Sequence, residues 1–201
     1  MKIKRDVLIS MLEKLHMDYQ NIKTVIDLGA WGGPISHWMQ ISMPNAKIYA
    51  VEPVIENFIV MQDMILSRYD NHIVPIFLAV SDHSGLQDMY ISENSRSHSM
   101  LEEMPISNPQ GMRRVPAMTW DDMMDALNIK EVDFCKVNIE GAEIEMFRGM
   151  TRVFPKKMAV ESHMRKLDSK EYKEELESLM AEKGYKIVDR GMITYLIEHE
   201  T

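Results

Sequence analysis

The sequence predicts an α/β fold with a doubly wound, mostly parallel seven-stranded sheet, an antiparallel carboxyl-terminal hairpin and an amino-terminal helix. Three observations support this fold class. Strand-like and helix-like segments alternate along the chain, as expected for strands joined by helical crossovers. The third strand-like segment contains Pro75, which cannot donate to a ladder and suits the edge position that a doubly wound sheet gives its third strand. The 201 residues are 45% hydrophobic, enough for a single domain over residues 1–201 with a packed core.

The first half of the chain carries the clearest periodic signals. Apolar residues from Val7 to Leu15 recur at helical spacing. Two strand-like runs follow, and each leads to a proline that suits the first turn of a helix. The predicted elements are a helix within residues 1–20, strands at 23–28 and 47–52, helices opened by Pro34 and Pro53, and the proline-bearing strand at 73–78.

The second half begins with a less regular stretch. Residues 85–92 suit an extra strand, whereas residues 93–112 lack a period and predict a loop over the sheet. We expect residues 85–115 to form an insertion that faces the substrate. The remaining predicted elements are a helix capped by Thr119, a strand at 132–139, a helix at 142–150, a strand at 157–161, a helix from Asp168 to Gly184 and a hairpin over 185–188 and 193–197.

Charge and cysteine content argue against several classes of function. The formal net charge is −8 and no basic cluster is longer than a pair such as Arg113-Arg114 or Lys156-Lys157, so a nucleic-acid partner is not favoured. The single cysteine, Cys135, cannot form an internal disulfide or a multi-cysteine metal site, and its apolar neighbours predict buried packing. Because the chain shows no signal peptide and no apolar run of about eighteen residues, we expect a cytoplasmic protein without a membrane segment.

The turn at residues 27–33, after the first strand, is the first candidate ligand site. It joins a strand to a helix and carries three glycines, which let a ligand approach the backbone closely. Trp31 and Pro34 occupy positions where a dinucleotide fingerprint needs glycine, and the Gly-Lys-Ser/Thr of a phosphate loop is missing. The Asp27 carboxylate would repel a pyrophosphate and attract an ammonium. A cation-bearing nucleoside such as S-adenosylmethionine therefore fits this turn better than a diphosphate.

Further polar residues follow the later strands. Glu52 ends the second strand, where a carboxylate can accept hydrogen bonds from both ribose hydroxyls, and Asp82 follows the third, where the adenine edge would lie. Alternation places Lys136, Asn138 and Glu140 on one side of the end of the fourth strand. For each carboxylate alone, an ordinary solvated side chain is the alternative. The residues predicted to bind the cofactor are Asp27, Gly29, Ala30, Trp31, Gly32, Glu52, Pro53, Ser81, Asp82 and Asn138.

Four segments together resemble the FkbM family of methyltransferases. They are Val25-Ile26-Asp27-Leu28-Gly29-Ala30, Val51-Glu52-Pro53, Ala79-Val80-Ser81-Asp82 and Lys136-Val137-Asn138-Ile139-Glu140-Gly141-Ala142-Glu143. The resemblance implies a class I, Rossmann-like, S-adenosylmethionine-dependent methyltransferase, of a family that usually methylates hydroxyl oxygens of sugars, polyketides or other small molecules. The chain departs from the family at Trp31, which is commonly asparagine, and at Asn138, which is commonly aspartate.

A hydroxyl acceptor loses its proton on methylation, so the site needs a base. Glu140 and His163 are the candidate bases, with Glu161 to orient the histidine, although a supporting structural role for His163 is an alternative. Lys136 is expected to hold Glu140 or to contact the substrate, and Asn138 completes the predicted catalytic set. A divalent metal held by these carboxylates, Asn138 or His163 would acidify the hydroxyl instead, and the sequence leaves the metal undecided.

The expected acceptor is a small molecule or sugar with a hydroxyl group. Methyltransferases of amino nitrogens often carry an Asn/Asp-Pro-Pro-aromatic turn after the fourth strand, where this chain has Asn138-Ile139-Glu140-Gly141. Arg96 and His98 are predicted to contact the acceptor, unless they are ordinary solvated loop residues. Seven methionines within residues 89–124 indicate a thioether-lined cover. The alternatives are an RNA or protein methyltransferase on the same fold and a non-catalytic S-adenosylmethionine-binding protein.

Overall fold

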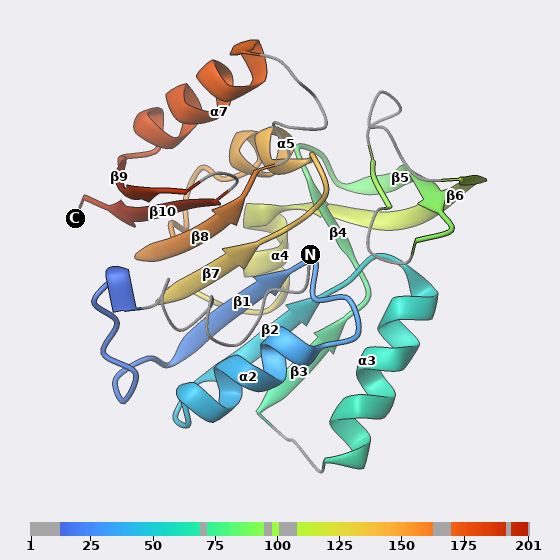
Figure 1. Cartoon of the computed structure of the whole chain (residues 1–201), viewed down its shortest axis with the longest axis horizontal. Coiled ribbons are helices and arrows are strands. Elements are labelled where there is room, and N and C mark those ends of the chain that lie inside the picture. The colour runs from blue at the N-terminus through green and yellow to red at the C-terminus, as the bar shows by residue number, and fades with distance from the viewer. Residues whose placement is uncertain are drawn as a thin grey trace.

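The structure, a computed structural model, describes residues 13–68, 72–94, 98–100, 108–162, 170–191 and 194–200. Within these residues, a seven-stranded sheet has the strand order β3-β2-β1-β7-β8-β10-β9 (Figure 1). β10 runs antiparallel to β8 and β9, and the other neighbours are parallel. The predicted doubly wound sheet with a closing hairpin is confirmed. Its strands are β1 (Thr24–Leu28), β2 (Lys47–Val51), β3 (Ile73–Ile76), β7 (Phe134–Val137), β8 (Lys157–Glu161), β9 (Tyr185–Arg190) and β10 (Thr194–His199).

Helices cover both faces of this sheet, which gives three layers (Figure 1). Successive strand residues alternate between the two cores: on β1, Val25 packs on one face, and Ile26 and Leu28 pack on the other. Strands buried on both faces account for the apolar runs in the sequence. The helices are α2 (Pro34–Ser42) and α3 (Ile55–Ser67) on the face of Val25, and α4 (Trp120–Ala126), α5 (Glu143–Arg148) and α7 (Lys170–Glu182) on the face of Ile26.

Pro75 lies in β3, the strand at one end of the sheet order. Among the strands described, β3 pairs with β2 alone, and Pro75 stands opposite Ala50. The missing N–H therefore falls on an edge strand and interrupts no second ladder. The edge position predicted from Pro75 is confirmed.

A second sheet lies beyond the carboxyl ends of the parallel strands, on the right of Figure 1. Its three strands are β4 (Ala79–Ser81), β6 (Pro109–Thr119) and β5 (Gly85–Ser92), in that order. β5 confirms the extra strand predicted at residues 85–92.

Two sequence predictions in this region are wrong. The third strand ends at Ile76 instead of residue 78, and the chain resumes as β4 in the second sheet. The loop expected over residues 93–112 gives way to β6 from Pro109. Pro116 obscures this strand in the sequence, but it lies just before the part of β6 that pairs with β4. On that side, the missing N–H of Pro116 leaves no ladder bond unmade.

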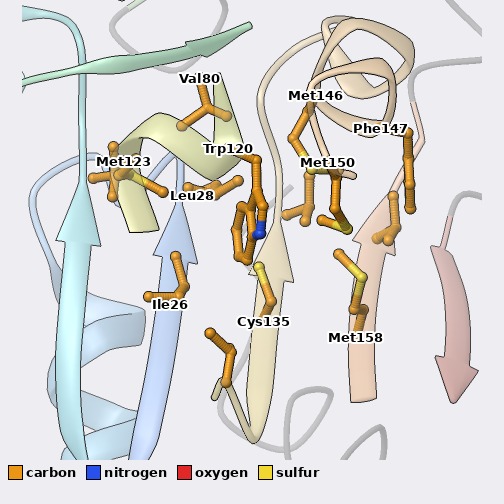
Figure 2. Close-up of a cluster of buried hydrophobic side chains, with 14 of the residues drawn as sticks. Ile26, Leu28, Val80, Trp120, Met123, Cys135, Met146, Phe147, Met150 and Met158 are labelled. Atoms are coloured by element: carbon orange, nitrogen blue, oxygen red, sulfur yellow. The ribbon is translucent and has the colours of Figure 1, made fainter. Parts of the chain in front are cut away.

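Trp120 is fully buried in the larger core, beside Cys135 and Met150 (Figure 2). Its indole Nε1 donates to Val153 O at 2.7 Å. The preceding residue caps α4 as predicted, because Thr119 Oγ1 accepts from Asp122 N at 3.1 Å. Cys135 is also fully buried, as expected, and burial raises the pKa of its thiol well above the ordinary value.

Methionine fills much of both cores. Met39, Met61, Met123, Met124 and Met180 are buried on the inner faces of their helices. At least twelve of the 20 methionines are buried: Met17, Met39, Met43, Met61, Met89, Met100, Met123, Met124, Met146, Met150, Met158 and Met180.

Some predictions fall partly outside the described residues. These include most of the predicted amino-terminal helix, residues 1–12. They also include Asp168, the residue predicted to begin the helix that the structure shows as α7. In the part of the chain that the structure describes, no helix combines the length and apolar character needed to cross a membrane.

Replacing the buried indole tests this packing. Trp120→Ala should lower the free energy of unfolding by about 3–5 kcal/mol, because it removes a large core side chain and leaves a cavity. Urea denaturation followed by far-ultraviolet circular dichroism measures the change. Leu86→Ala, at a side chain that is 66% exposed, is the control and should change stability by less than about 0.5 kcal/mol. Equal effects of the two substitutions would contradict the assignment of Trp120 to the core.

Candidate functional site

The carboxyl ends of β2, β1, β7 and β8 lie side by side, because these neighbouring strands are parallel (Figure 1). Open parallel sheets bind ligands at this edge. The loops that leave it are the glycine turn (residues 29–33) after β1, residues 52–54 after β2, and residues 138–142 after β7.

The glycine turn is held by its own peptide groups. Gly29 N and Ala30 N each donate to Val51 O at 3.0 Å, and Gly33 N donates to Ala30 O at 2.9 Å. Gly29, Trp31 and Gly33 have φ angles of 72°, 50° and 82°. Glycine adopts this left-handed region without strain, and asparagine enters it more readily than most other residues. Trp31 adopts this region at the position where the FkbM resemblance implies asparagine.

Gly29 also permits a close approach between β1 and the loop after β7. A Cβ atom on Gly29 would lie 1.8 Å from Asn138 O. On the same strands, Asn138 N donates to Leu28 O at 3.1 Å. The glycine turn and the loop after β7 therefore form one packed unit.

The Glu52 carboxylate connects β2 to the glycine turn. Its Oε2 accepts from Trp31 N at 2.9 Å, and its Oε1 accepts from Val54 N at 3.0 Å and Asn57 Nδ2 at 3.2 Å. The side chain is buried, and burial raises the pKa of Glu52 despite these hydrogen bonds. The structure brings the Glu52 carboxylate against the turn, while the predicted contacts of Glu52 and Pro53 with the cofactor stay predictions.

Lys136 and Asp27 form a buried ion pair on the neighbouring strands β7 and β1, with Nζ 2.9 Å from Oδ1. The Lys136 ammonium also donates to Leu28 O at 3.1 Å and to Gly29 O at 2.9 Å. The second carboxylate oxygen of Asp27 accepts from Ser36 Oγ, on α2, at 2.6 Å. The pair thus links β7, β1 and α2 beneath the glycine turn.

This geometry corrects the role expected for Lys136. The Lys136 ammonium donates to two carbonyls of β1 and the glycine turn and forms an ion pair with Asp27, so Lys136 holds the turn instead of Glu140 or a substrate. Asp27 is fully buried, with Lys136 and Ser36 at its two oxygens. Its carboxylate therefore faces the protein interior and not the open side of the turn, where the sequence suggested an ammonium ligand.

Asn138 and Glu161 meet at the ends of β7 and β8. Asn138 Nδ2 donates to Glu161 Oε2 at 3.0 Å. Among the described residues, neither Asn138 Oδ1 nor the Oγ of Ser162, the residue after Glu161, has a hydrogen-bond partner, although both atoms are buried. Leaving such an atom unpaired costs about 1–3 kcal/mol, so each unpaired atom in a folded protein requires an explanation.

The turn at Glu140 and Gly141 is held from two elements that sequence reasoning missed. Ser99 Oγ donates to Glu140 O at 2.8 Å. Gly141 N donates to Glu143 Oε1 at 3.2 Å, and Glu143 Oε2 accepts from the Tyr172 hydroxyl of α7. Burial and the Glu143 carboxylate raise the pKa of Tyr172. Glu143 belongs to the segment that resembles the FkbM family, whereas no sequence signal indicates Ser99 or Tyr172.

The remaining predicted residues are less closely tied to this edge. Ser81 pairs with Thr119 in the second sheet. Asp82 Oδ1 accepts from Ser81 Oγ at 3.3 Å and lies 2.7 Å from His83 Nδ1, and this histidine lowers the pKa of Asp82. These contacts join Asp82 to its chain neighbours, and its contact with adenine stays a prediction. His163 lies outside the described residues.

His98, predicted to contact the acceptor, accepts a hydrogen bond from Ser92 N through its Nδ1 at 3.0 Å. Burial lowers the pKa of this imidazole. With Nδ1 occupied as an acceptor, the neutral ring carries its proton on Nε2 and is a hydrogen-bond donor. Arg96 lies outside the described residues.

Metal binding was the alternative to a side-chain base. Among the residues whose placement is described, no three His, Cys, Asp or Glu side chains gather closely enough to hold a metal ion. His163, one of the four side chains considered as ligands, is not among them.

Substitution of Gly29 tests the contact between the turn and the loop after β7. Gly29→Ala should lower the free energy of unfolding by about 2 kcal/mol or more, because the new Cβ combines left-handed strain with a collision with Asn138 O. Gly111→Ala is the matched control: its φ is +105° and no atom of the described residues lies within 4 Å of the added Cβ. Denaturation curves that place the two variants at the same stability would contradict the close approach.

The chain is similar to known methyltransferases in sequence and in fold. The family model for the methyltransferase FkbM domain matches residues 29–187. A solved FkbM methyltransferase from Methylobacillus flagellatus KT is 15% identical with a TM-score of 0.57, and the match covers 91% of this chain and 45% of that protein. The chain thus spans less than half the length of that relative. A search of curated proteins gave no significant match.

Two further solved structures have a similar fold. A putative caffeoyl-CoA O-methyltransferase from Staphylococcus aureus is 11% identical with a TM-score of 0.57, over 94% of this chain and 83% of that one. Fibrillarin from Aeropyrum pernix, solved with natively bound S-adenosyl-L-methionine, is 16% identical with a TM-score of 0.51, over 95% of this chain and 72% of that one. The family model covers more than half of the chain, including the glycine turn and the strands of the sheet from β2 to β8. The chain therefore belongs to the FkbM methyltransferase domain family.

Proposed function

We propose that this protein is an S-adenosylmethionine-dependent methyltransferase that binds its cofactor at the glycine turn and Glu52. The contact between Glu52 and Trp31 N carries this proposal, because it joins the carboxylate at the end of β2 to the turn after β1. Glycine at position 29 allows the turn to lie against Asn138 O. A carboxylate at position 52 can accept hydrogen bonds from ribose hydroxyls. The fibrillarin structure with bound S-adenosyl-L-methionine supports the choice of cofactor.

Methyl transfer is an in-line displacement, so the main task of the protein is to align the acceptor with the methyl group. Bound S-adenosylmethionine supplies that methyl group on a positively charged sulfur. Ala30 of the glycine turn and Glu52 are buried, and they would exclude water from one side of the cofactor. Glu161, at the end of β8, and Glu140, after β7, are the described carboxylates near the place where an acceptor would enter.

We propose a hydroxyl group as the acceptor. Asn138 Oδ1 is buried and has no partner among the residues that the structure describes, so a donor from the acceptor, such as an O–H group, would remove an unfavourable free energy there. Asn138 cannot take a proton, because a carboxamide is not a base at neutral pH. Glu161, bonded to Asn138 Nδ2, is then the base that the geometry favours.

A small, neutral acceptor suits the charges of the chain. The net charge is −8. Many of the arginines are already paired with carboxylates, which lowers the positive charge available to a polyanion such as RNA. These paired residues are Arg113, Arg114, Arg148, Arg152 and Arg190.

A thermal-shift panel tests the cofactor. S-adenosylmethionine and S-adenosylhomocysteine should each raise the melting temperature, and NAD should not, because a ligand that binds the native state alone stabilises it. Stabilisation by NAD but not by the two adenosyl ligands would overturn the proposed function.

Substitution of Glu52 tests the position of the ribose. Glu52→Ala should weaken S-adenosylmethionine binding by about tenfold or more, because charge-assisted hydrogen bonds of about 1.5–3 kcal/mol are lost. Isothermal titration calorimetry measures the affinity. Glu56→Ala, on the first turn of α3, removes an exposed carboxylate and should leave the affinity unchanged. An unaltered affinity in Glu52→Ala would show that the ribose lies elsewhere.

A turnover panel tests the acceptor and the base. With labelled S-adenosylmethionine, we expect label to enter hydroxyl-bearing sugars or small molecules rather than RNA, protein or amines. Glu161→Gln should lower kcat by about a hundredfold, as expected for the loss of a general base, while cofactor affinity stays within about twofold. Transfer to RNA or protein would support the alternative acceptor class. Tight cofactor binding without turnover on any acceptor would support a non-catalytic binding protein.

A further inference from the structure

We propose that Lys136 is a positioning residue that fixes the backbone of the glycine turn before the cofactor arrives. The proposal rests on the proposed function, since it assigns Lys136 to the turn that we expect to hold S-adenosylmethionine. Lys136 does not touch the ligand in this scheme. It acts through the carbonyl groups of Leu28 and Gly29.

The position of Lys136 follows from strand register. Lys136 on β7 stands beside Asp27 on β1, and both side chains lie on the face of the sheet covered by α2. The side chain of Lys136 is 7% exposed and that of Asp27 is 0% exposed. An ammonium with three N–H groups and three acceptors within 3.1 Å has little freedom to turn elsewhere.

Two peptide groups of the turn are consequently held at both ends. In the Leu28–Gly29 peptide, the carbonyl accepts from Lys136 Nζ and the N–H donates to Val51 O. In the Gly29–Ala30 peptide, the carbonyl again accepts from Lys136 Nζ and the N–H again donates to Val51 O. A peptide bonded at its carbonyl and at its N–H cannot rotate without breaking one of the two bonds.

The charge of Lys136 also reaches the second part of the proposed cofactor site. Burial raises the pKa of Glu52, and the positive charge of Lys136 opposes that effect. Lys136 therefore favours the ionised carboxylate that would accept from ribose hydroxyls. One buried cation thus supports both the shape of the turn and the charge of Glu52.

Asp27 has a different task in this arrangement. An isolated buried ammonium would be strongly destabilising, and the Asp27 carboxylate balances its charge. Ser36 Oγ donates to the other oxygen of that carboxylate. If charge balance were the whole role of the pair, removing both charges together would leave cofactor binding intact. If Lys136 positions the turn, removing both charges would restore stability without restoring affinity.

The test compares Lys136→Met with the double variant Asp27→Asn/Lys136→Met. The single variant strands a buried carboxylate and should lower the melting temperature. The double variant should recover most of that loss, yet bind S-adenosylmethionine about tenfold or more weakly in calorimetry, because Gly29 O loses its Lys136 donor and Leu28 O keeps only Asn138 N. Parental affinity in the double variant would overturn the proposal.

A matched control pair lies at the opposite end of the sheet. Lys157, at the start of β8, pairs with Glu198 on β10, and these side chains are 21% and 36% exposed. Lys157→Met/Glu198→Gln should leave the affinity for S-adenosylmethionine unchanged. A tenfold loss in this control would overturn the proposal, because any lysine–carboxylate pair of the sheet would then have the same effect.

Hydrogen exchange of the parent protein gives a second test that needs no variant. Without cofactor, the amides of Gly29 and Ala30 should already be protected to a degree similar to those of β1. Addition of S-adenosylmethionine should protect them little further. Rapid exchange of both amides in the free protein would overturn the proposal. Failure of the parent to bind S-adenosylmethionine would instead refute the proposed function. The exchange rates of the free protein would still show whether the turn is held in place.

Discussion

The edge where β1, β7 and α2 meet depends on one buried positive charge. An ammonium removed from water costs several kcal/mol unless an opposite charge and further acceptors surround it. Asp27 supplies the charge, and the carbonyls of Leu28 and Gly29 supply the other acceptors. Both carbonyls lie at the start of the glycine turn. The condition that makes Lys136 tolerable inside the protein therefore also sets the path of the chain around the proposed cofactor site.

The parallel sheet is predictable from the sequence because burial on both faces leaves short apolar runs separated by helices. The bounds of β8 match those predicted, and Pro75 identifies the edge strand before any pairing is known. The second sheet is not predictable in the same way. β4 has three residues, too few to show the alternation of apolar and polar residues that marks a strand. β6 contains Pro116, which is uncommon inside a strand. Their pairing is decided by neighbours distant in sequence, and those neighbours are visible only in the folded chain.

The candidate site likewise has parts that the sequence predicts and parts that it does not. The sequence locates the glycine turn and Glu52, because both directly follow recognisable strands. It does not reveal the partner of Lys136, since that depends on β1 and β7 being neighbours and in register. The link from Tyr172 through Glu143 to Gly141 has the same character, because it joins α7 to the edge of the sheet. The sequence thus predicts where a residue lies along its strand, but it does not predict which residue of another strand it contacts.

The methionine-rich cores make chemical damage and unfolding mutually dependent. At least twelve thioethers are shielded from solvent in the native state. An oxidant such as peroxide reaches them when the chain opens, and each sulfoxide introduces a polar group that the repacked core cannot accommodate. Oxidation of the open chain thus hinders its return to the native state. Damage follows the equilibrium population of the open chain where oxidation is slower than refolding, and the unfolding rate where oxidation is faster.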